Sequence, residues 1–319
     1  DWSSDVCSSD LGDDELLKAA RRVWRNTTGK NIFVTGGIGP SAANEGFTRD
    51  YDLPTHNAYQ ESCASIGTAM WAHRLNLLTG EAQYADAVET ALYNAIPAGV
   101  QVDGTRFFYV NPLASRGGHH RTAWFGSACC PPNLARTFAS IGTYAYATGA
   151  DSLYVNLFVQ GTVRAAVGKE AMSLSVVTDY PLDGTIELKV TEAPKAAVAL
   201  NVRVPGWCTQ ASILVNSEPV TLPADIRGNY CVLRREWKAG DSVLLVYDMP
   251  VRTIEPDPRA EPLRGSVAFA RGPMVYCAEQ VDHEVPIDQI IAPPGTTRSE
   301  EHTFELQSPC NLVCRLLLE

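Results

Sequence analysis

The spacing of apolar residues changes once along this chain, at Thr148-Gly149-Ala150-Asp151. Before this point they recur about every 3.6 residues, which is the period of a helix packed on one side. After it they alternate with polar residues, which is the period of a strand with one buried face. A chain of 319 residues is long enough to bury a core in each part. The pattern predicts an α + β multidomain fold, with helices first and strands second.

The N-terminal part contains several segments with helical spacing. Residues 13–26 begin with acids and end with bases, which suits the dipole of a helix. Residues 64–78 end at Thr79-Gly80, and a further segment runs from Glu81 to Asn94, so the two predict an αα-hairpin. Residues 133–144 predict another apolar helix. Paired helices of this kind predict part of an α/α toroid.

The C-terminal part is a succession of short alternating segments bounded by turn residues. They cover residues 153–159, 161–163, 172–177, 185–190, 198–204, 212–216, 230–233 and 242–247. Their number and spacing predict a β-sandwich. Residues 251–291 predict a small further β element, with strands at 266–270 and 274–277.

Both ends of the chain differ in character from the rest. Residues 298–308 resemble the translation of a sequencing adapter, and residues 7–11 resemble one translated from the opposite strand. We therefore expect non-native tails at 1–11 and 298–319 and leave them out of the fold argument. The remaining chain divides into a partial α/α barrel at 12–148, a β-sandwich domain at 149–250 and a C-terminal β element at 251–297.

Charge and hydropathy argue against two classes of partner. The net charge of −10 is unsuited to nucleic acid, because phosphate binding needs a basic surface. No stretch approaches the roughly 18 uninterrupted apolar residues of a membrane span. The Gly-rich stretch 35–40 lacks the spacing of a phosphate-binding loop. The sequence does not fix the oligomeric state, and a homodimer stays open.

Two adjacent cysteines, Cys129 and Cys130, stand directly before Pro131-Pro132. Because a residue before proline is disfavoured in the helical region, we expect both thiols on stiff, non-helical backbone. Upstream, Glu61 and Cys63 are two residues apart and would diverge on a continuous helix. If they serve the same centre as the cysteine pair, they lie at the entry of a helix or on an extended turn.

Three thiolates and one carboxylate form a ligand set of the softness that zinc prefers. Glu61, Cys63, Cys129 and Cys130 therefore predict a Zn²⁺ site. Four protein ligands ordinarily make a closed structural site. A purely structural zinc, buried cysteines without metal, and a cysteine that is also a nucleophile all stay open at this point.

The other cysteines of the central sequence lie in strand-like segments and predict small buried hydrophobic side chains: Cys208, Cys231 and Cys277. A disulfide framework is not expected in a chain long enough to bury a real core. Free thiolates at a metal favour a reducing compartment, so we expect a cytoplasmic location. An absent native N-terminus leaves secretion open.

Six blocks of sequence together resemble glycoside hydrolase family 127, the β-L-arabinofuranosidases. They are 33–39 (FVTGGIG), 51–54 (YDLP), 61–64 (ESCA), 91–94 (ALYN), 106–113 (RFFYVNPL) and 129–133 (CCPPN), and they occur in the order of the family. The resemblance covers about residues 13–290. It implies an (α/α)6 barrel, of which this chain holds the C-terminal part, followed by β-sandwich domains.

The resemblance also implies roles for individual residues. Members of the family use a zinc-bound cysteine as the nucleophile, which matches Cys129, with Glu61, Cys63 and Cys130 as the other ligands. Glu45 matches the general acid/base. Glu89 and Tyr109 match positions that contact the sugar. The chain departs from the family pattern at 44–47, where NEGF stands for the usual GEAF, and much of the barrel that should precede residue 13 is absent.

The function implied is a retaining exo-glycosidase that releases β-L-arabinofuranose from the non-reducing ends of glycans. We expect a raised pKa at Glu45 from a partly apolar pocket and nearby negative charge, since the group must begin protonated. His119 and His120 are candidates for sugar or second-layer contacts, or for an exposed loop pair. A related enzyme for another furanose and a non-catalytic carbohydrate-binding or structural zinc fragment are the alternatives.

Overall fold

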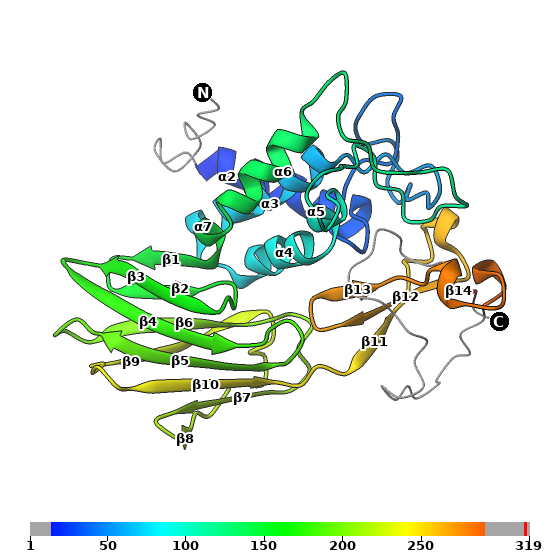
Figure 1. Ribbon diagram of the computed structural model, residues 1–319. Coiled ribbons are helices and arrows are strands. Elements are labelled where there is room, and N and C mark those ends of the chain that lie inside the picture. Colours follow the sequence, from blue (N-terminus) through cyan, green and yellow to red (C-terminus); the bar gives the residue numbers. More distant parts are fainter. Residues whose placement is uncertain (1–13, 291–315, 318–319) are drawn as a thin grey trace.

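The protein is described here by a computed structural model that covers residues 14–290 and 316–317. The helices lie above two large sheets in Figure 1, and a small third sheet lies beside them on the right. The helical elements are α2 (Asp14–Asn26), the π-helical turn η1 (Thr27–Asn31), α3 (Ser62–Thr79), α4 (Ala82–Tyr93), α5 (Ala95–Ala98), α6 (Cys130–Ala139) and α7 (Gly142–Ala145). This mixed α + β arrangement agrees with the change of period in the sequence.

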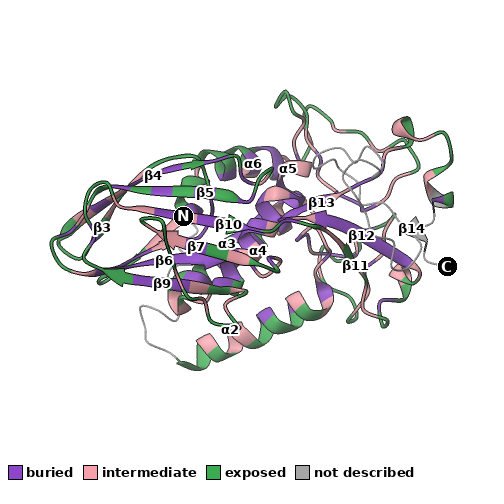
Figure 2. Cartoon of the chain, turned by 90° about the horizontal axis from the view of Figure 1, so that it is seen from below, coloured by how far each residue is buried: buried purple, intermediate pink, exposed green. Residues whose placement is uncertain are grey.

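Helix α2 confirms the prediction for residues 13–26 and packs on one side only. Its outer side is exposed (Figure 2). On its inner side, the Trp24 indole is buried and makes edge contacts with Trp71 of α3 and Tyr84 of α4, with ring centroids 5.0 and 5.3 Å apart. Aromatic side chains therefore fasten the first helix to the αα-hairpin.

Helices α3 and α4 form the predicted hairpin. Gly80 ends α3 in the left-handed conformation, with φ +66°, and donates its N–H to the Asn76 carbonyl. A residue with a side chain is strained in this conformation, so glycine suits the turn. The hairpin places the start of α3 and the end of α4 at the same end of the pair, close to the irregular segment of residues 32–61.

Two predictions for the helical part need correction. The helix expected over 133–144 begins earlier, at Cys130, and ends at Ala139, because the next residue, Ser140, has non-helical dihedral angles of φ −109° and ψ 10°. The change from helix to strand, placed at 148–151 by the apolar period, comes slightly earlier, because Tyr146–Gly149 already form a strand. Local propensity does not fix such boundaries, since packing against other elements decides them.

The strands form two large sheets. The first has the order β1-β2-β6-β9, and β2 and β6 are its parallel pair. The second has the order β3-β4-β5-β10-β7-β8 and is antiparallel throughout. The strands are β1 (Tyr146–Gly149), β2 (Ser152–Val155), β3 (Gly161–Val167), β4 (Glu170–Thr178), β5 (Thr185–Glu192), β6 (Val198–Val204), β7 (Ala211–Val215), β8 (Glu218–Pro219), β9 (Asn229–Arg235) and β10 (Ser242–Tyr247).

Buried side chains of both sheets meet in one hydrophobic core. Leu153, Leu200 and Val202 come from the first sheet, and Leu188 and Leu245 from the second. Strand β5 alternates buried and exposed residues, as a strand with one covered face does. Strand β6 is buried along its whole length (Figure 2). It therefore has neighbours on both faces, and one of these neighbours is the helical part.

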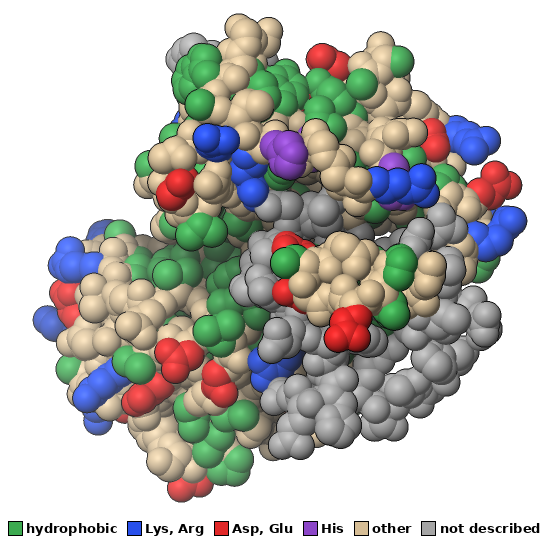
Figure 3. All heavy atoms as spheres, turned by 45° about the vertical axis from the view of Figure 1, so that its right-hand side comes forward, with side chains coloured by type: hydrophobic (Ala, Val, Ile, Leu, Met, Phe, Trp, Pro, Cys, Tyr) green, Lys and Arg blue, Asp and Glu red, His purple; other side chains and the backbone are tan. Residues whose placement is uncertain are grey.

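The third sheet contains β11 (Val251–Ile254), β12 (Ser266–Arg271) and β13 (Met274–Tyr276). The short strand β14 (Leu316–Leu317) pairs with the start of β12. Apart from these two residues, the expected non-native tails at 1–11 and 298–319 lie outside the described residues. Within the described part of the chain, no helix has the length and apolar character needed to cross a bilayer. On the face shown in Figure 3, acidic and basic side chains are interspersed.

Candidate active site and metal centre

Four side chains that the sequence singled out meet at the N-terminal ends of two helices. Glu61 precedes α3, Cys63 lies in its first turn, Cys129 precedes α6 and Cys130 begins it. Their potential ligand atoms all lie within 4.8 Å of one another. Cys63 Sγ is 3.5 Å from Cys130 Sγ, which is 3.7 Å from Cys129 Sγ. This group of four, called the thiol cluster below, has the geometry of a site that holds one metal ion.

The backbone under the cysteine pair differs from the prediction. Cys129 has helical dihedral angles, φ −74° and ψ −40°, and Cys130 is the first residue of α6. Pro131 and Pro132 fit here because the first N–H groups of a helix have no partner within it, and the proline ring fixes a φ close to the helical value. The preference of a pre-proline residue for extended backbone is outweighed, and both thiols sit on a rigid helix start.

The segment that carries Glu61 is fixed by a buried amide pair. Gln60 Nε2 donates to the Asn111 carbonyl at 2.9 Å, and Asn111 Nδ2 donates to the Gln60 carbonyl at 2.9 Å and to Ser62 Oγ at 3.0 Å. Gln60 has a φ of +37°, an unusual value for a residue with a side chain. These bonds hold the chain in a sharp bend and direct the next side chain, Glu61, toward the cysteines, where its Oε1 lies 3.2 Å from Cys129 Sγ.

A row of polar contacts leads from the thiol cluster to Glu45. Tyr109 Oη and Cys129 Sγ are hydrogen-bonded at 3.2 Å. The Tyr109 ring lies beside Tyr59, with centroids 6.1 Å apart, and Tyr59 Oη donates to Glu45 Oε1 at 3.3 Å. Sequence reasoning missed the role of Tyr59, although its position directly before Gln60-Glu61 was a signal. The structure brings the predicted residues Glu45, Tyr109 and Cys129 into one network.

The surroundings of Glu45 differ from the expectation. Its side chain is exposed, and the partly apolar pocket predicted around it is not formed by the part of the chain described here. Glu45 has a φ of +51°, and the neighbouring Asn44 stabilises this bend by accepting from the Gly46 N–H at 3.2 Å and donating to the Phe47 carbonyl at 3.0 Å. Asn44, one of the departures from the family pattern at 44–47, thus stabilises the bend that carries Glu45.

The three thiols of the cluster differ in acidity. The hydrogen bond between the Cys63 and Cys130 thiols lowers the pKa of Cys63 to about 7. The same pairing, together with burial, raises the pKa of Cys130. Burial also raises the pKa of Cys129, although its contact with Tyr109 acts in the opposite direction. In the absence of metal, Cys63 is therefore the first of the three to lose its proton.

Glu89, predicted to contact the sugar, lies elsewhere. It is buried on α4, where it forms an ion pair with Arg203 of β6 and accepts hydrogen bonds from Tyr180 Oη at 2.6 Å and Trp207 Nε1 at 3.1 Å. None of these partners belongs to the thiol cluster. Arg203, the centre of this second group of charges, drew no attention in the sequence because it stands within an ordinary strand pattern.

The two histidines before the cysteine pair behave differently from each other. The His119 ring stacks on Phe108, with centroids 4.4 Å apart, and its Nε2 hydrogen-bonds to the Val110 carbonyl at 2.9 Å. His120 is exposed. Since Phe108 and Val110 flank Tyr109, His119 supports the segment that presents the Tyr109 hydroxyl to Cys129.

Comparisons with known proteins show to which family the chain is similar. Residues 7–143 match the catalytic-domain model of the GH127 β-L-arabinofuranosidases, residues 152–249 match their middle-domain model, and residues 251–311 match the family's C-terminal domain model. A curated non-reducing end β-L-arabinofuranosidase from Bifidobacterium longum subsp. longum is 35% identical over an alignment of 292 residues, and the match covers 86% of this chain and 43% of that protein.

Solved structures show the same relation. A crystal structure of a GH127 β-L-arabinofuranosidase from Geobacillus stearothermophilus T6 has a TM-score of 0.86 at 39% identity and covers 90% of this chain and 47% of that one. A second GH127 β-arabinofuranosidase has a TM-score of 0.85 at 38% identity, with the same coverage. This chain spans about half the length of these relatives. By its sequence and its fold, the chain belongs to glycoside hydrolase family 127.

Proposed function

We propose that this chain is part of a retaining exo-glycosidase that releases β-L-arabinofuranose from the non-reducing ends of glycans. The observation that carries the proposal is the row of contacts from Cys129 through Tyr109 and Tyr59 to Glu45. It joins a potential nucleophile to a carboxylic acid, the two groups that a retaining mechanism needs. Substrate contact by Tyr109 is part of the proposal.

We propose zinc as the metal of the thiol cluster. In a tetrahedral zinc site with Zn–S bonds of about 2.3 Å, two sulfur ligands lie about 3.8 Å apart. The separations of 3.5 Å for Cys63–Cys130 and 3.7 Å for Cys129–Cys130 are close to this value. Three sulfur donors and one carboxylate oxygen also favour zinc over calcium or magnesium, which prefer oxygen. When bound, the zinc would keep Cys129 deprotonated at neutral pH.

Cys129 is the best placed of the three thiols to attack a sugar. It is exposed, whereas Cys130 is buried and Cys63 is half-buried. Cys129 Sγ would form a bond to the anomeric carbon while the glycosidic C–O bond breaks and Glu45 gives its proton to the leaving oxygen. Glu45 would then take a proton from water, whose oxygen displaces Cys129 Sγ. Two displacements at one carbon retain its configuration.

Glu45→Gln is expected to lower turnover of an unactivated arabinofuranoside by about 10²–10⁴-fold, because the amide supplies no proton to the leaving group. Hydrolysis of a substrate whose leaving group needs no proton should suffer less in the first step. Asp52→Asn is a control, since Asp52 is also a carboxylate of this segment and accepts a hydrogen bond from Thr48. Equal losses for both substrates with Glu45→Gln would contradict the acid/base role.

Zinc affinity is expected to fall by about a hundredfold when the pH drops from 8 to 7. Thiols must lose their protons to bind the metal, and the pKa values of Cys129 and Cys130 are both raised. Below about pH 7, the pKa of Cys63, a third proton joins the competition and the decrease becomes steeper. Competition with a chromophoric chelator across this pH range measures the effect. An affinity independent of pH would mean that the thiols do not hold the metal.

The domain organisation forms part of the same proposal. Residues 12–148 would be the C-terminal part of an (α/α)6 barrel, residues 149–250 a β-sandwich and residues 251–297 a C-terminal β element. The family membership of all three parts supports this division. Three thiolates at one metal favour a reducing compartment, so we propose a cytoplasmic location.

The stereochemical course of the reaction tests the proposed function. A β-L-arabinofuranoside is incubated with this chain, and the first anomer released is identified by proton NMR, with a full-length relative as a positive control. Release of the β-anomer is expected. Release of the α-anomer would exclude the retaining mechanism. Binding of the glycan without hydrolysis would favour the non-catalytic alternative. Preference for another furanose would keep the proposed mechanism and show that the proposed substrate is wrong.

A further inference from the structure

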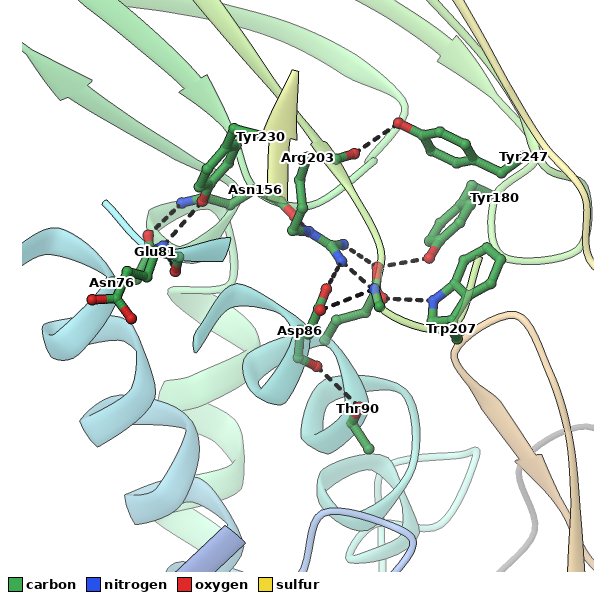
Figure 4. Close-up of polar contacts among 12 residues, drawn as sticks. Asn76, Glu81, Asp86, Thr90, Asn156, Tyr180, Arg203, Trp207, Tyr230 and Tyr247 are labelled. Carbon is green, nitrogen blue, oxygen red and sulfur yellow. Dashed lines mark hydrogen bonds and ion pairs between the residues drawn. The ribbon is translucent and has the colours of Figure 1, made fainter. Parts of the chain in front are cut away.

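A second buried group of charges lies where the helical part meets the first sheet. The Arg203 side chain extends from β6 toward α4 and points to Asp86 (Figure 4). It forms ion pairs with both Asp86 and Glu89, and its Nε donates to the Asn156 carbonyl at 2.6 Å. Arg203 and Glu89 are both almost completely buried, at 0% and 1% exposure. Such a cluster is costly to form unless every charge is paired.

Glu89 has no free position for a sugar hydroxyl. Its Oε1 accepts from Tyr180 Oη and an Arg203 nitrogen, and its Oε2 accepts from the other Arg203 nitrogen at 3.3 Å and from Trp207 Nε1 at 3.1 Å. Each oxygen of the carboxylate therefore already accepts two hydrogen bonds, which is its usual capacity. A role in holding α4 in place agrees with these contacts, and direct contact with substrate does not.

Helix α4 is bonded to residues next to the first sheet and to residues of the third sheet. Near its start, Asp86 Oδ2 accepts the Gly206 N–H at 2.9 Å. Just past its end, Asn94 Nδ2 donates to the Pro273 carbonyl at 2.9 Å, and Asn94 Oδ1 accepts the Val275 N–H at 2.8 Å. The position of α4 is thus set by residues far away in the sequence, with the ion pair to Arg203 at its centre.

A short series of close contacts connects α4 to the thiol cluster. A Cβ on Gly36 would lie 3.0 Å from the Ala91 nitrogen, so this loop touches the α4 backbone directly. The Ala95 N–H also donates to the Thr35 carbonyl at 3.2 Å. At the next residue a Cβ on Gly37 would overlap Gln60 Oε1, and the Gln60 N–H donates to the Gly39 carbonyl at 2.8 Å. Gln60 directly precedes Glu61, a member of the cluster.

We propose that Arg203 and Glu89 are positioning residues, whose ion pair holds α4 and, through the 35–39 loop and Gln60, sets the position of Glu61 in the thiol cluster. The metal affinity of the cluster and the reactivity of Cys129 then depend on Arg203, a residue of the first sheet. This inference rests on the metal centre proposed above. It assigns the first sheet a part in building the active site, whereas a separable carbohydrate-binding module would have no such part.

The test compares zinc affinity in the full chain and three variants, Arg203→Met, Glu89→Gln and the double variant, at a temperature where circular dichroism shows each to be folded. Each single change is expected to weaken zinc binding by about tenfold, within the usual range of coupling between sites. The double variant should lose no more than Arg203→Met alone, because both changes break one contact. Arg164→Met, which breaks the exposed pair with Glu192, is the matched control and should bind zinc as the wild type does.

A pair of glycine variants tests whether α4 acts on the thiol cluster through the 35–39 loop. Gly36→Ala adds a methyl group against Ala91 and should weaken zinc binding as Arg203→Met does. Gly104 has a similar φ, +72° against +84°, but its added Cβ would meet nothing within 4 Å. Gly104→Ala therefore carries the same backbone strain without the contact, and it should leave zinc binding unchanged. Equal effects of the two glycine variants would contradict the proposed route.

A second readout separates this inference from the proposed metal centre. The rate at which iodoacetamide alkylates Cys129 is measured by mass spectrometry of the metal-free proteins. If Arg203→Met lowers thermal stability but leaves both the zinc affinity and the alkylation rate of the folded protein unchanged, the positioning role is wrong. If the wild type binds no zinc, the proposed metal centre is wrong, and the alkylation rate then tests the positioning role by itself. A rate that Arg203→Met alters and Arg164→Met does not would support the positioning role. A rate that Arg203→Met leaves unaltered would overturn it.

Discussion

Cys129→Ser is expected to abolish covalent labelling by a β-L-arabinofuranosyl haloacetamide and to lower any turnover by about 10³-fold or more. A serine hydroxyl stays protonated near neutral pH, whereas a thiol at a metal is available as thiolate, and covalent catalysis depends on the attacking group. Labelling is measured by intact mass and peptide mapping, and retention of the fold by circular dichroism. The exposed position of Cys129 in the thiol cluster makes it the target.

The matched control is Cys208→Ser. Cys208 is a buried thiol that donates to the Gln210 carbonyl at 3.0 Å, and a hydroxyl can make the same bond. This variant should be labelled at the wild-type rate. If Cys129→Ser loses metal and fold together, the cluster is structural. If Cys129→Ser is still labelled at the wild-type rate, the nucleophile lies elsewhere.

Arg203→Met is expected to reduce the free energy of unfolding by about 3–5 kcal/mol. The change leaves the carboxylates of Asp86 and Glu89 without their counter-charge where α4 packs on the first sheet. Methionine keeps much of the side-chain volume, so the loss reports the charge more than a cavity. Urea unfolding followed by tryptophan fluorescence measures the change. Arg164→Met, in an exposed pair, should have no measurable effect, and a comparable loss there would contradict the argument.

The loss of unfolding free energy in Arg203→Met should also depend on pH. Burial raises the pKa of Asp86 in the folded protein, and Arg203 partly opposes this shift. A carboxyl with a raised folded pKa binds its proton more tightly when folded, so its effect on stability becomes less favourable as pH rises through that pKa. Without Arg203 the pKa rises further. The difference between wild type and Arg203→Met should therefore shrink as pH falls from 7 toward 5. A difference that grows over this range would contradict the assignment.

Local patterns in the sequence predict much of the fold. The acid-to-base order of residues 13–26 predicts α2, Gly80 marks the end of α3, and alternation predicts strands such as β4 and β5. These features depend on neighbouring residues, which the sequence shows directly. The helix start at Cys130 was missed because the local rule for a residue before proline competes with the tolerance of a first helical turn for proline.

The thiol cluster was predictable for a different reason. Glu61 and Cys63, and Cys129 and Cys130, carry unusual residue types at short spacings, and the six blocks of family sequence join the two pairs. No such signal joins Glu89 to Arg203, which are separated by 114 positions and meet only in the folded chain. Within its strand, Arg203 has the period of an ordinary exposed position, and only burial from the helical side reveals its role.

The most direct test of the central claim is the mass of the intact protein after incubation with the β-L-arabinofuranosyl haloacetamide, with zinc content measured on the same sample. A full-length relative serves as the positive control. We predict about one zinc per chain and one label on Cys129. Zinc without label in both proteins would contradict the claim that Cys129 is a nucleophile and leave a structural metal site. Label on the relative alone would show that this half-length chain lacks a competent sugar pocket.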